Sequence, residues 1–185
     1  MYRTLRLLAR AGIQNIWSPS SKLTLSAMVV SPGGVGTTTV MEHISQFCTI
    51  NDPYDADKLK HLPRPPKWVV DNASMPVLFV TGDTDDIVRS LKRRGWNRIQ
   101  AARLASPLGV IAPAEMSDRS LIKSIHQQQN QWERIPSHRF KLIDYNDIWS
   151  SAAVLAKHFR IDDERFIRQF PKKRKRKSVS PDSEK

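Results

Sequence analysis

The chain has 185 residues and carries 30 Lys and Arg against 18 Asp and Glu, so its formal net charge is +12. Residues 171–185 contribute a net +5 and residues 1–41 a net +4, which leaves +3 on residues 42–170, so the basic character belongs mainly to the two ends. The length favours one domain with its own core, the single cysteine excludes a disulfide framework, and no apolar run reaches the roughly 20 residues of a membrane span.

Residues 2–17 predict an amphipathic helix, because apolar side chains recur on one helical face opposite arginines. An Arg-rich, acid-free helix is typical of a targeting presequence or of a helix lying on a membrane surface. A stripe of this kind more often packs against the domain that follows, and that is the interpretation favoured here. We therefore expect a helix and linker over residues 1–22, ahead of a domain over residues 23–170.

Three short apolar runs in the domain predict buried strands, at residues 23–30, 77–80 and 140–143. Helical patterns lie between and after them, near residues 85–104, 118–132, 148–159 and 164–170. Strands alternating with helices favour an α/β fold with a parallel sheet. We expect a P-loop nucleotide-binding fold of three layers with a short parallel sheet.

A glycine-rich turn joins the first predicted strand to the first predicted helix. Glycines at this place let the backbone fold around an anion, and the amides and hydroxyls at the start of the helix point toward it. The turn supplies Gly33, Gly34 and Gly36, followed by Thr37, Thr38 and Thr39. The sequence therefore predicts a phosphate-binding loop, the alternative being a glycine turn that only connects the two elements.

A nucleoside-triphosphate loop of the usual pattern has a lysine directly before its Ser or Thr. Here Thr37 occupies that position, and no lysine occurs from residue 23 to residue 57. Ordinary ATP hydrolysis and an NTP-dependent kinase are therefore disfavoured.

With this turn the sequence resembles the sulfotransferase superfamily, whose members use 3′-phosphoadenosine 5′-phosphosulfate (PAPS) as donor. The stretch Gly36-Thr37-Thr38 is similar to the core of the family's first loop. The resemblance implies that this loop holds the 5′-phosphate of PAPS as co-substrate. The family's loop lysine corresponds to Gly34, so that charge is missing from the loop.

A second segment, Lys60-His61-Leu62-Pro63, resembles the family's Lys-Thr-His-Leu-Pro loop. The resemblance implies that His61 is the general base on the acceptor hydroxyl, a role suited to an imidazole of near-neutral pKa. Lys58 or Lys60 would then stabilise the charge that develops during transfer. The alternative is a solvated loop histidine.

A third segment, the predicted strand at residues 77–80 and the helix after it, resembles the family's 3′-phosphate motif. Asp86 and Ser90 fall on that motif, and Gly82 takes the place of its arginine. The resemblance implies that Ser90, together with Arg93 or Arg94, holds the 3′-phosphate. The alternative is a solvated basic helix face. Residues 140–161 resemble the family's late strand and helix. This resemblance bears on the fold and not on the chemistry.

The five histidines show no paired metal spacing, so we expect no metal site. Trp96, Trp132 and the other tryptophans of the domain are scattered over different elements, and we expect them in the core or at an interface. The tail at residues 171–185 contains six consecutive cations, Lys172 to Lys177, and is expected to be disordered. It is typical of a nuclear-import signal, or of a segment that associates loosely with nucleic acid.

Two functions therefore remain open. The first is a cytoplasmic sulfotransferase-like enzyme, nuclear if its source is eukaryotic, that moves a sulfuryl group from PAPS to a hydroxylated acceptor. The second is a non-catalytic relative that binds a nucleotide or nucleic acid.

Overall fold

The structure is a computed structural model that describes residues 25–105 and 116–173. The predicted N-terminal helix and most of the basic tail lie outside these residues. Three parallel strands form the central sheet in the order β1-β2-β3, namely β1 (Met28–Val30), β2 (Val77–Thr81) and β3 (Phe140–Asp144). All three lie where strands were predicted, and the α/β class with a short parallel sheet is confirmed. Within the described residues β1 is shorter than predicted.

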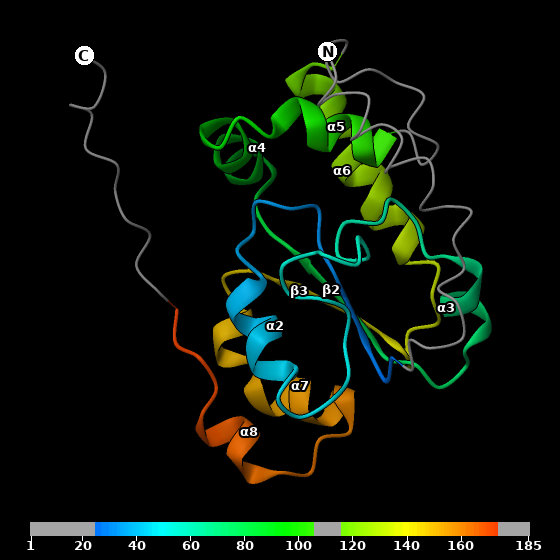
Figure 1. Cartoon of the computed structure of the whole chain (residues 1–185), viewed down its shortest axis with the longest axis vertical. Helices are drawn as coiled ribbons and strands as arrows, with labels where there is room; N and C mark the ends of the chain where they lie inside the picture. Colours follow the sequence, from blue (N-terminus) through cyan, green and yellow to red (C-terminus); the bar gives the residue numbers. More distant parts are fainter. Residues whose placement is uncertain (1–24, 106–115, 174–185) are drawn as a thin grey trace.

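The helices follow the strands in an alternating order (Figure 1). After β1 come α2 (Thr38–Ile44) and α3 (Lys67–Asp71). After β2 come α4 (Thr84–Arg93), α5 (Asn97–Ala105) and α6 (Asp118–Trp132). After β3 come the short 3₁₀ turn η2 (Ile148–Ser150), α7 (Ala152–Phe159) and α8 (Glu164–Arg168).

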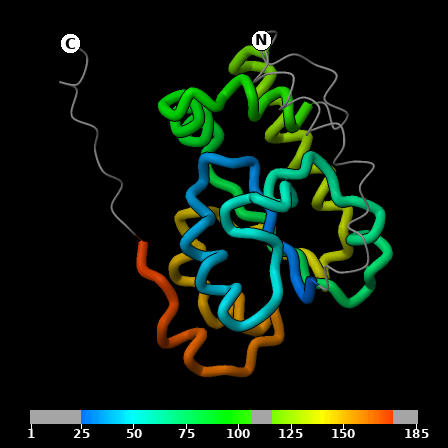
Figure 2. The backbone as a smooth tube through the Cα atoms, viewed as in Figure 1, coloured from blue at the N-terminus to red at the C-terminus, as the bar shows by residue number. Residues whose placement is uncertain are grey.

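Alternate side chains of β2 enter two different cores, because successive residues of a strand point to opposite faces of the sheet. Leu78 and Val80 belong to the larger core, which also holds apolar residues of α2, α4, α5, α6, α7 and α8. Val77 and Phe79 belong to the smaller core, which includes Trp132 at the end of α6. The sheet is thus covered on both faces, and the smoothed backbone of Figure 2 shows it crossing the middle of the molecule.

The prediction of a single helix at residues 85–104 is wrong, because the structure has two helices there, α4 and α5. Gly95 adopts a left-handed conformation, with φ of 68°. Its amide donates to the Lys92 carbonyl at 2.8 Å, and the Trp96 amide donates to the Leu91 carbonyl at 2.9 Å. These bonds satisfy the last carbonyls of α4 and end the helix. The helix predicted at 148–159 is likewise divided, into η2 and α7.

Trp132 is fully buried, as expected, whereas Trp96 is exposed at the turn between α4 and α5. None of the helices in the described part of the chain is long and apolar enough to cross a membrane.

Candidate functional site

The glycine-rich turn lies at the edge of the sheet where the parallel strands end, which is where open α/β sheets bind ligands. It follows β1 directly and leads into α2. Gly82 comes just after β2 and Tyr145 just after β3. A Cβ added to Gly82 would lie 3.4 Å from Val35 in the turn and 3.6 Å from Tyr145. The turn and the two strand ends therefore meet at one edge.

The backbone of the turn requires glycine at two of its positions. Gly34 has φ of 75°, and a Cβ there would lie 3.1 Å from the carbonyl oxygen of Ile87. Gly36 has φ of 69°, and a Cβ there would lie 3.4 Å from the ring of Tyr145. L-residues rarely adopt such φ values. At Gly34 the backbone of α4 also crowds a Cβ, whereas at Gly36 a Cβ would make an ordinary contact with the Tyr145 ring. A lysine at position 34 is therefore disfavoured by the backbone conformation of this turn and by the close contact with α4.

Lys60 brings a cation to the turn from another segment. Its ammonium donates to Oγ1 of Thr38 at 3.0 Å and to the carbonyl of Pro53 at 2.7 Å. Only 5% of the residue is exposed. Burial lowers the pKa of Lys60 to about 8; nearby carboxylates, Asp55 first, raise it, and the charge of Arg94 lowers it further. The predicted residues Lys60 and Thr38 are thus in contact, and the predicted residue Arg94 acts on Lys60 through its charge.

A buried ion pair holds the segment that carries Lys60. The Asp55 carboxylate accepts from Nη1 of Arg103 at 2.7 Å and from the Lys60 amide at 3.1 Å. Arg103 also donates through Nη2 to the carbonyl of Lys58 at 3.0 Å. Burial raises the pKa of Asp55, but the charge and hydrogen bonds of Arg103 outweigh it, and the net pKa lies below its ordinary value. Lys58 itself donates to the Asp55 carbonyl at 2.9 Å, so its ammonium supports this segment's own backbone.

His61 lies against the start of the turn. Its Nδ1 is 2.8 Å from the Ser31 carbonyl, so Nδ1 carries the proton and donates, and Nε2 is left as an acceptor. Its Cε1 would lie 3.6 Å from a Cβ on Gly33. Burial, with a further contribution from Arg103, lowers the pKa of His61 to about 4. The imidazole is therefore neutral at pH 7, the state that a general base needs, although its low pKa makes it a weak base.

Two glutamines and one tryptophan of α5 and α6 donate hydrogen bonds to the glycine-rich turn and to the segment that carries His61. Gln100 donates through Nε2 to the Pro32 carbonyl at 2.9 Å. Gln128 and Trp132 both donate to the Leu62 carbonyl, at 2.8 Å and 3.0 Å. These side chains fix the glycine-rich turn and the His61 segment to the same pair of helices.

The residues predicted to hold a second phosphate lie in different environments. Ser90 is only 4% exposed and belongs to the buried face of α4. Arg93 is exposed and makes no hydrogen bond or ion pair with the residues that the structure describes. Arg94 is exposed as well, but its charge reaches Lys60.

The three threonines that follow the glycines also differ in burial and in hydrogen bonding. Thr37 is buried, and its side chain does not cap α2. Oγ1 of Thr38 accepts a hydrogen bond from the Lys60 ammonium. Thr39 is half-buried, and its hydroxyl forms no hydrogen bond with the described residues.

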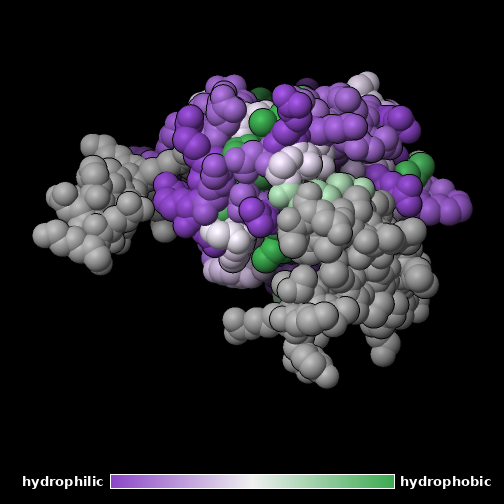
Figure 3. Space-filling view, turned by 90° about the horizontal axis from the view of Figure 1, so that it is seen from above, coloured by the Kyte–Doolittle hydropathy of each residue, from purple (hydrophilic) through white to green (hydrophobic). Residues whose placement is uncertain are grey.

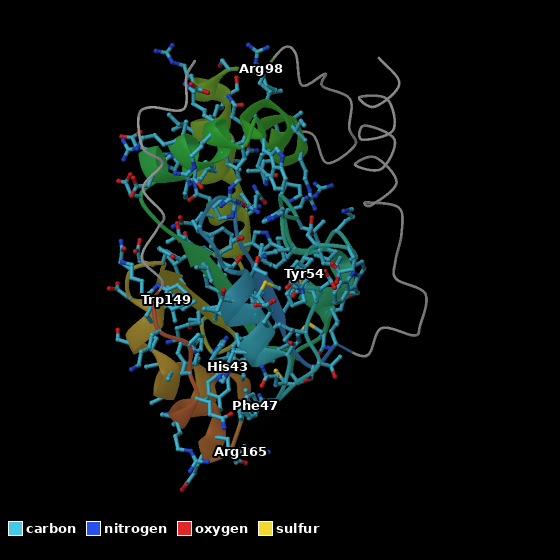
Figure 4. All side chains as sticks on the ribbon, turned by 60° about the vertical axis from the view of Figure 1, so that its left-hand side comes forward. His43, Phe47, Tyr54, Arg98, Trp149 and Arg165 are labelled. Atoms are coloured by element: carbon cyan, nitrogen blue, oxygen red, sulfur yellow. The ribbon has the colours of Figure 1, made fainter. Side chains whose placement is uncertain are left out.

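The base of the C-terminal tail approaches the same edge of the sheet. Lys173 donates to Oδ1 of Asn146 at 2.8 Å, and its Nζ lies 5.7 Å from the ring centroid of Tyr145. Tyr145 in turn faces Gly36 and makes an edge contact with Trp149, which Figure 4 labels. Lys173, the last described residue of the cationic run, therefore lies beside Tyr145 at the glycine-rich turn.

Two residues of this site, Asp55 and Arg103, were not predicted from the sequence, and neither was the contact between the predicted residues Lys60 and Thr38. The first pair is 48 positions apart and the second 22, so no local spacing links them. The one available signal was the group of charged residues in the segment at 52–60. No three His, Cys, Asp or Glu side chains gather as a metal site within residues 25–105 and 116–173.

Comparison of the chain with family models, with curated proteins and with solved structures finds no match. The assignment of the site therefore depends on the geometry of this chain.

Proposed function

We propose that this protein binds PAPS at the glycine-rich turn of residues 31–39 and transfers its sulfuryl group to a hydroxylated acceptor. The observation that carries the proposal is the buried ammonium of Lys60, which donates to Thr38 beside the turn. The turn itself contains no lysine, and a side chain at position 34 would be strained by its φ and by the contact with Ile87. Lys60 supplies the equivalent charge from a neighbouring loop.

A buried cation with a lowered pKa favours an anionic ligand, because an anion would offset the cost of keeping the ammonium charged. Burying the charged ammonium of Lys60 lowers the stability of the fold. Structural lysines are more often found with their ammonium in water. Positions where burial and a specific charge partner perturb a pKa are frequently functional, and three such positions, Asp55, Lys60 and His61, lie within seven residues of this loop.

In the proposed reaction the acceptor oxygen attacks sulfur, and the bond between sulfur and the bridging phosphate oxygen breaks. The acceptor proton passes to Nε2 of His61, whose lone pair is free because Nδ1 donates to Ser31. Lys60 neutralises the charge on the departing phosphate oxygen, a role that cations commonly play in group transfer from nucleotides. The product nucleotide is 3′-phosphoadenosine 5′-phosphate (PAP).

Arg94 and the hydroxyl of Thr38 are the further groups that we assign to the phosphates of the nucleotide. Lys58 has a different role, because its ammonium donates to the carbonyl of Asp55 in its own segment, whereas the Lys60 ammonium also reaches Thr38 of α2. We therefore assign it to the support of the loop, and assign the transfer itself to Lys60.

Titration calorimetry with PAP tests the proposal. We expect saturable binding to the full chain, at least tenfold weaker binding to Lys60→Met, and unchanged binding to Lys67→Met. Lys67 is a suitable control because its ammonium is exposed and pairs with Asp71 on α3. Absence of saturable PAP binding to the wild-type chain would refute the proposal.

A second candidate function is nucleotide binding without catalysis, and the pKa of His61 favours it. A pKa of about 4 makes the imidazole a poor proton acceptor at pH 7. An assay of PAPS conversion to PAP distinguishes the two functions. Simple alcohols serve as acceptors, and the PAP formed is measured by chromatography. The enzyme forms PAP at a rate that His61→Asn lowers, whereas the binding protein forms none above the uncatalysed rate while still binding PAP.

A further inference from the structure

A basic, aromatic corner lies between α4 and α5, and Arg94 is its one residue that also belongs to the candidate site. It comprises residues 92–98, with Gly95 at its tip in the left-handed conformation. No atom lies within 4 Å of the place where a Cβ on Gly95 would stand, so the tip faces open space. The indole of Trp96 follows directly and is 56% exposed. A large aromatic ring in this position has no role in either core.

Exposed arginines stand on both sides of Trp96 in the sequence. Arg93, Arg94 and Arg98 are exposed, and none of them forms a hydrogen bond or an ion pair with the residues that the structure describes. Lys92 differs, because its ammonium pairs with Asp118 at 2.9 Å. Figure 4 places Arg98 at one extreme end of the molecule, far from Arg165 of α8 at the other. Seen from that end in Figure 3, the described surface is largely hydrophilic.

An exposed ring among unpaired arginines matches the chemistry of single-stranded nucleic acid. The strand offers phosphates to the guanidinium groups and a free base face to the indole, and base stacking on an aromatic side chain is tolerant of sequence. A duplex offers the phosphates but keeps its base faces stacked within the helix. An acidic peptide offers charge but need not present a flat aromatic face. The combination of Trp96 with Arg93 and Arg98 therefore favours the single strand.

We propose that the α4–α5 corner binds single-stranded nucleic acid, with Trp96 stacked on a base and Arg93 and Arg98 on the flanking phosphates. This inference does not depend on the proposed function, because neither Trp96 nor these two arginines are among the groups assigned to PAPS. It also differs from association through the tail, since the corner belongs to the folded domain.

Fluorescence anisotropy with a fluorescein-labelled 12-nucleotide oligo-dT tests the inference on the full chain. We expect Trp96→Ala to weaken binding about tenfold, within the range for the loss of one base–aromatic stack, and Trp96→Phe to retain most of the affinity. The double variant Arg93→Gln, Arg98→Gln should lower the slope of log affinity against log salt by about 1.4, since two phosphate contacts are lost. Arg168→Gln, an exposed arginine of α8, is the matched control and should bind like the wild type.

Three results would overturn the inference. The first is equal affinity of Trp96→Ala and wild type, which would place binding in the tail or elsewhere. The second is an equally tight, Trp96-dependent complex with a duplex or with poly-glutamate, and the third is no binding of oligo-dT at low salt. PAP titrations of the same variants distinguish the two proposals, because loss of oligonucleotide binding with PAP binding intact leaves the proposed function standing.

Discussion

Replacing Lys60 with methionine should separate ligand binding from stability. The ammonium is buried, and its pKa falls from 10.5 to about 8, which corresponds to a cost of about 3 kcal/mol for keeping it charged in the folded state. Methionine has a similar length and no charge, so Lys60→Met removes this cost. It also leaves Thr38 Oγ1 and the Pro53 carbonyl without their donor, which costs about 1–3 kcal/mol.

The two terms nearly cancel, so we expect the free energy of unfolding of Lys60→Met at pH 7 to equal that of the wild type or to exceed it by up to about 2 kcal/mol. The pH dependence has a definite sign. Because the folded pKa lies below the unfolded one, the wild type gains stability as the pH rises from about 8 to 10.5, and the variant lacks this gain.

Urea denaturation at pH 7 and at pH 9.5 measures both effects, and calorimetry with PAP measures binding. A variant that is destabilised by more than about 3 kcal/mol, the full cost of breaking a buried polar contact, while its affinity for PAP is unchanged would refute the reasoning. Lys60 would then be a structural residue of its loop. The exposed Lys67→Met control should leave stability and affinity at their wild-type values.

Three further predictions concern the surroundings of Lys60. The pKa of His61 is lowered to about 4, so acidification from pH 6.5 to 4 should destabilise the wild-type fold by up to about 3 kcal/mol. Thermal melts over this pH range should show a smaller loss of stability for His61→Gln. Equal losses of stability in the wild type and the variant would contradict this prediction. Arg103→Met leaves the buried Asp55 carboxylate without its partner and should lower the free energy of unfolding in urea by about 3–5 kcal/mol, whereas an effect below 1 kcal/mol would show that the pair is dispensable. Gly36→Ala combines a strained φ with contact on the Tyr145 ring, whereas Gly95→Ala has a matching φ of 68° and open space. We therefore expect only Gly36→Ala to weaken PAP binding, and equal weakening in both would point to backbone strain alone.

The strands and the glycine-rich turn could be predicted from the sequence because their signals are local. The run at residues 77–80 is short, apolar and rich in β-branched residues, and β2 forms there. The predicted helix at residues 118–132 matches α6, which begins after Ser117, whose side chain accepts from the Ser120 amide. Gly33, Gly34 and Gly36 all adopt the positive φ that a glycine-rich turn requires.

The break between α4 and α5 was missed because basic residues common in helices continue on both sides of it. Isolated glycine is tolerated within helical sequences, so Gly95 alone does not show where a helix ends. Only the hydrogen bonds of Gly95 and Trp96 to the last turn of α4 reveal the cap. The exposure of Trp96 follows from this break and could not be predicted without it.

The charges of the site could be predicted only in part. The resemblance to sulfotransferases indicated Lys60 and His61, but not that Lys60 contacts Thr38 or that burial keeps His61 neutral while its Nδ1 donates to the Ser31 carbonyl. Asp55 and Arg103 were not anticipated, because an ion pair across 48 positions leaves no periodic signal. The roles of these groups depend on tertiary contacts and on burial.

The pKa of Lys60 with and without PAP is the most direct test of the central claim. It can be followed by NMR of the lysine side chains, with Lys60→Arg identifying the resonance. We expect a value of about 8 in the free protein and a clear rise toward 10.5 when PAP is bound, because the phosphate favours the charged ammonium. A pKa that PAP leaves unchanged at saturation would show that Lys60 does not contact the nucleotide, and would contradict the proposed site.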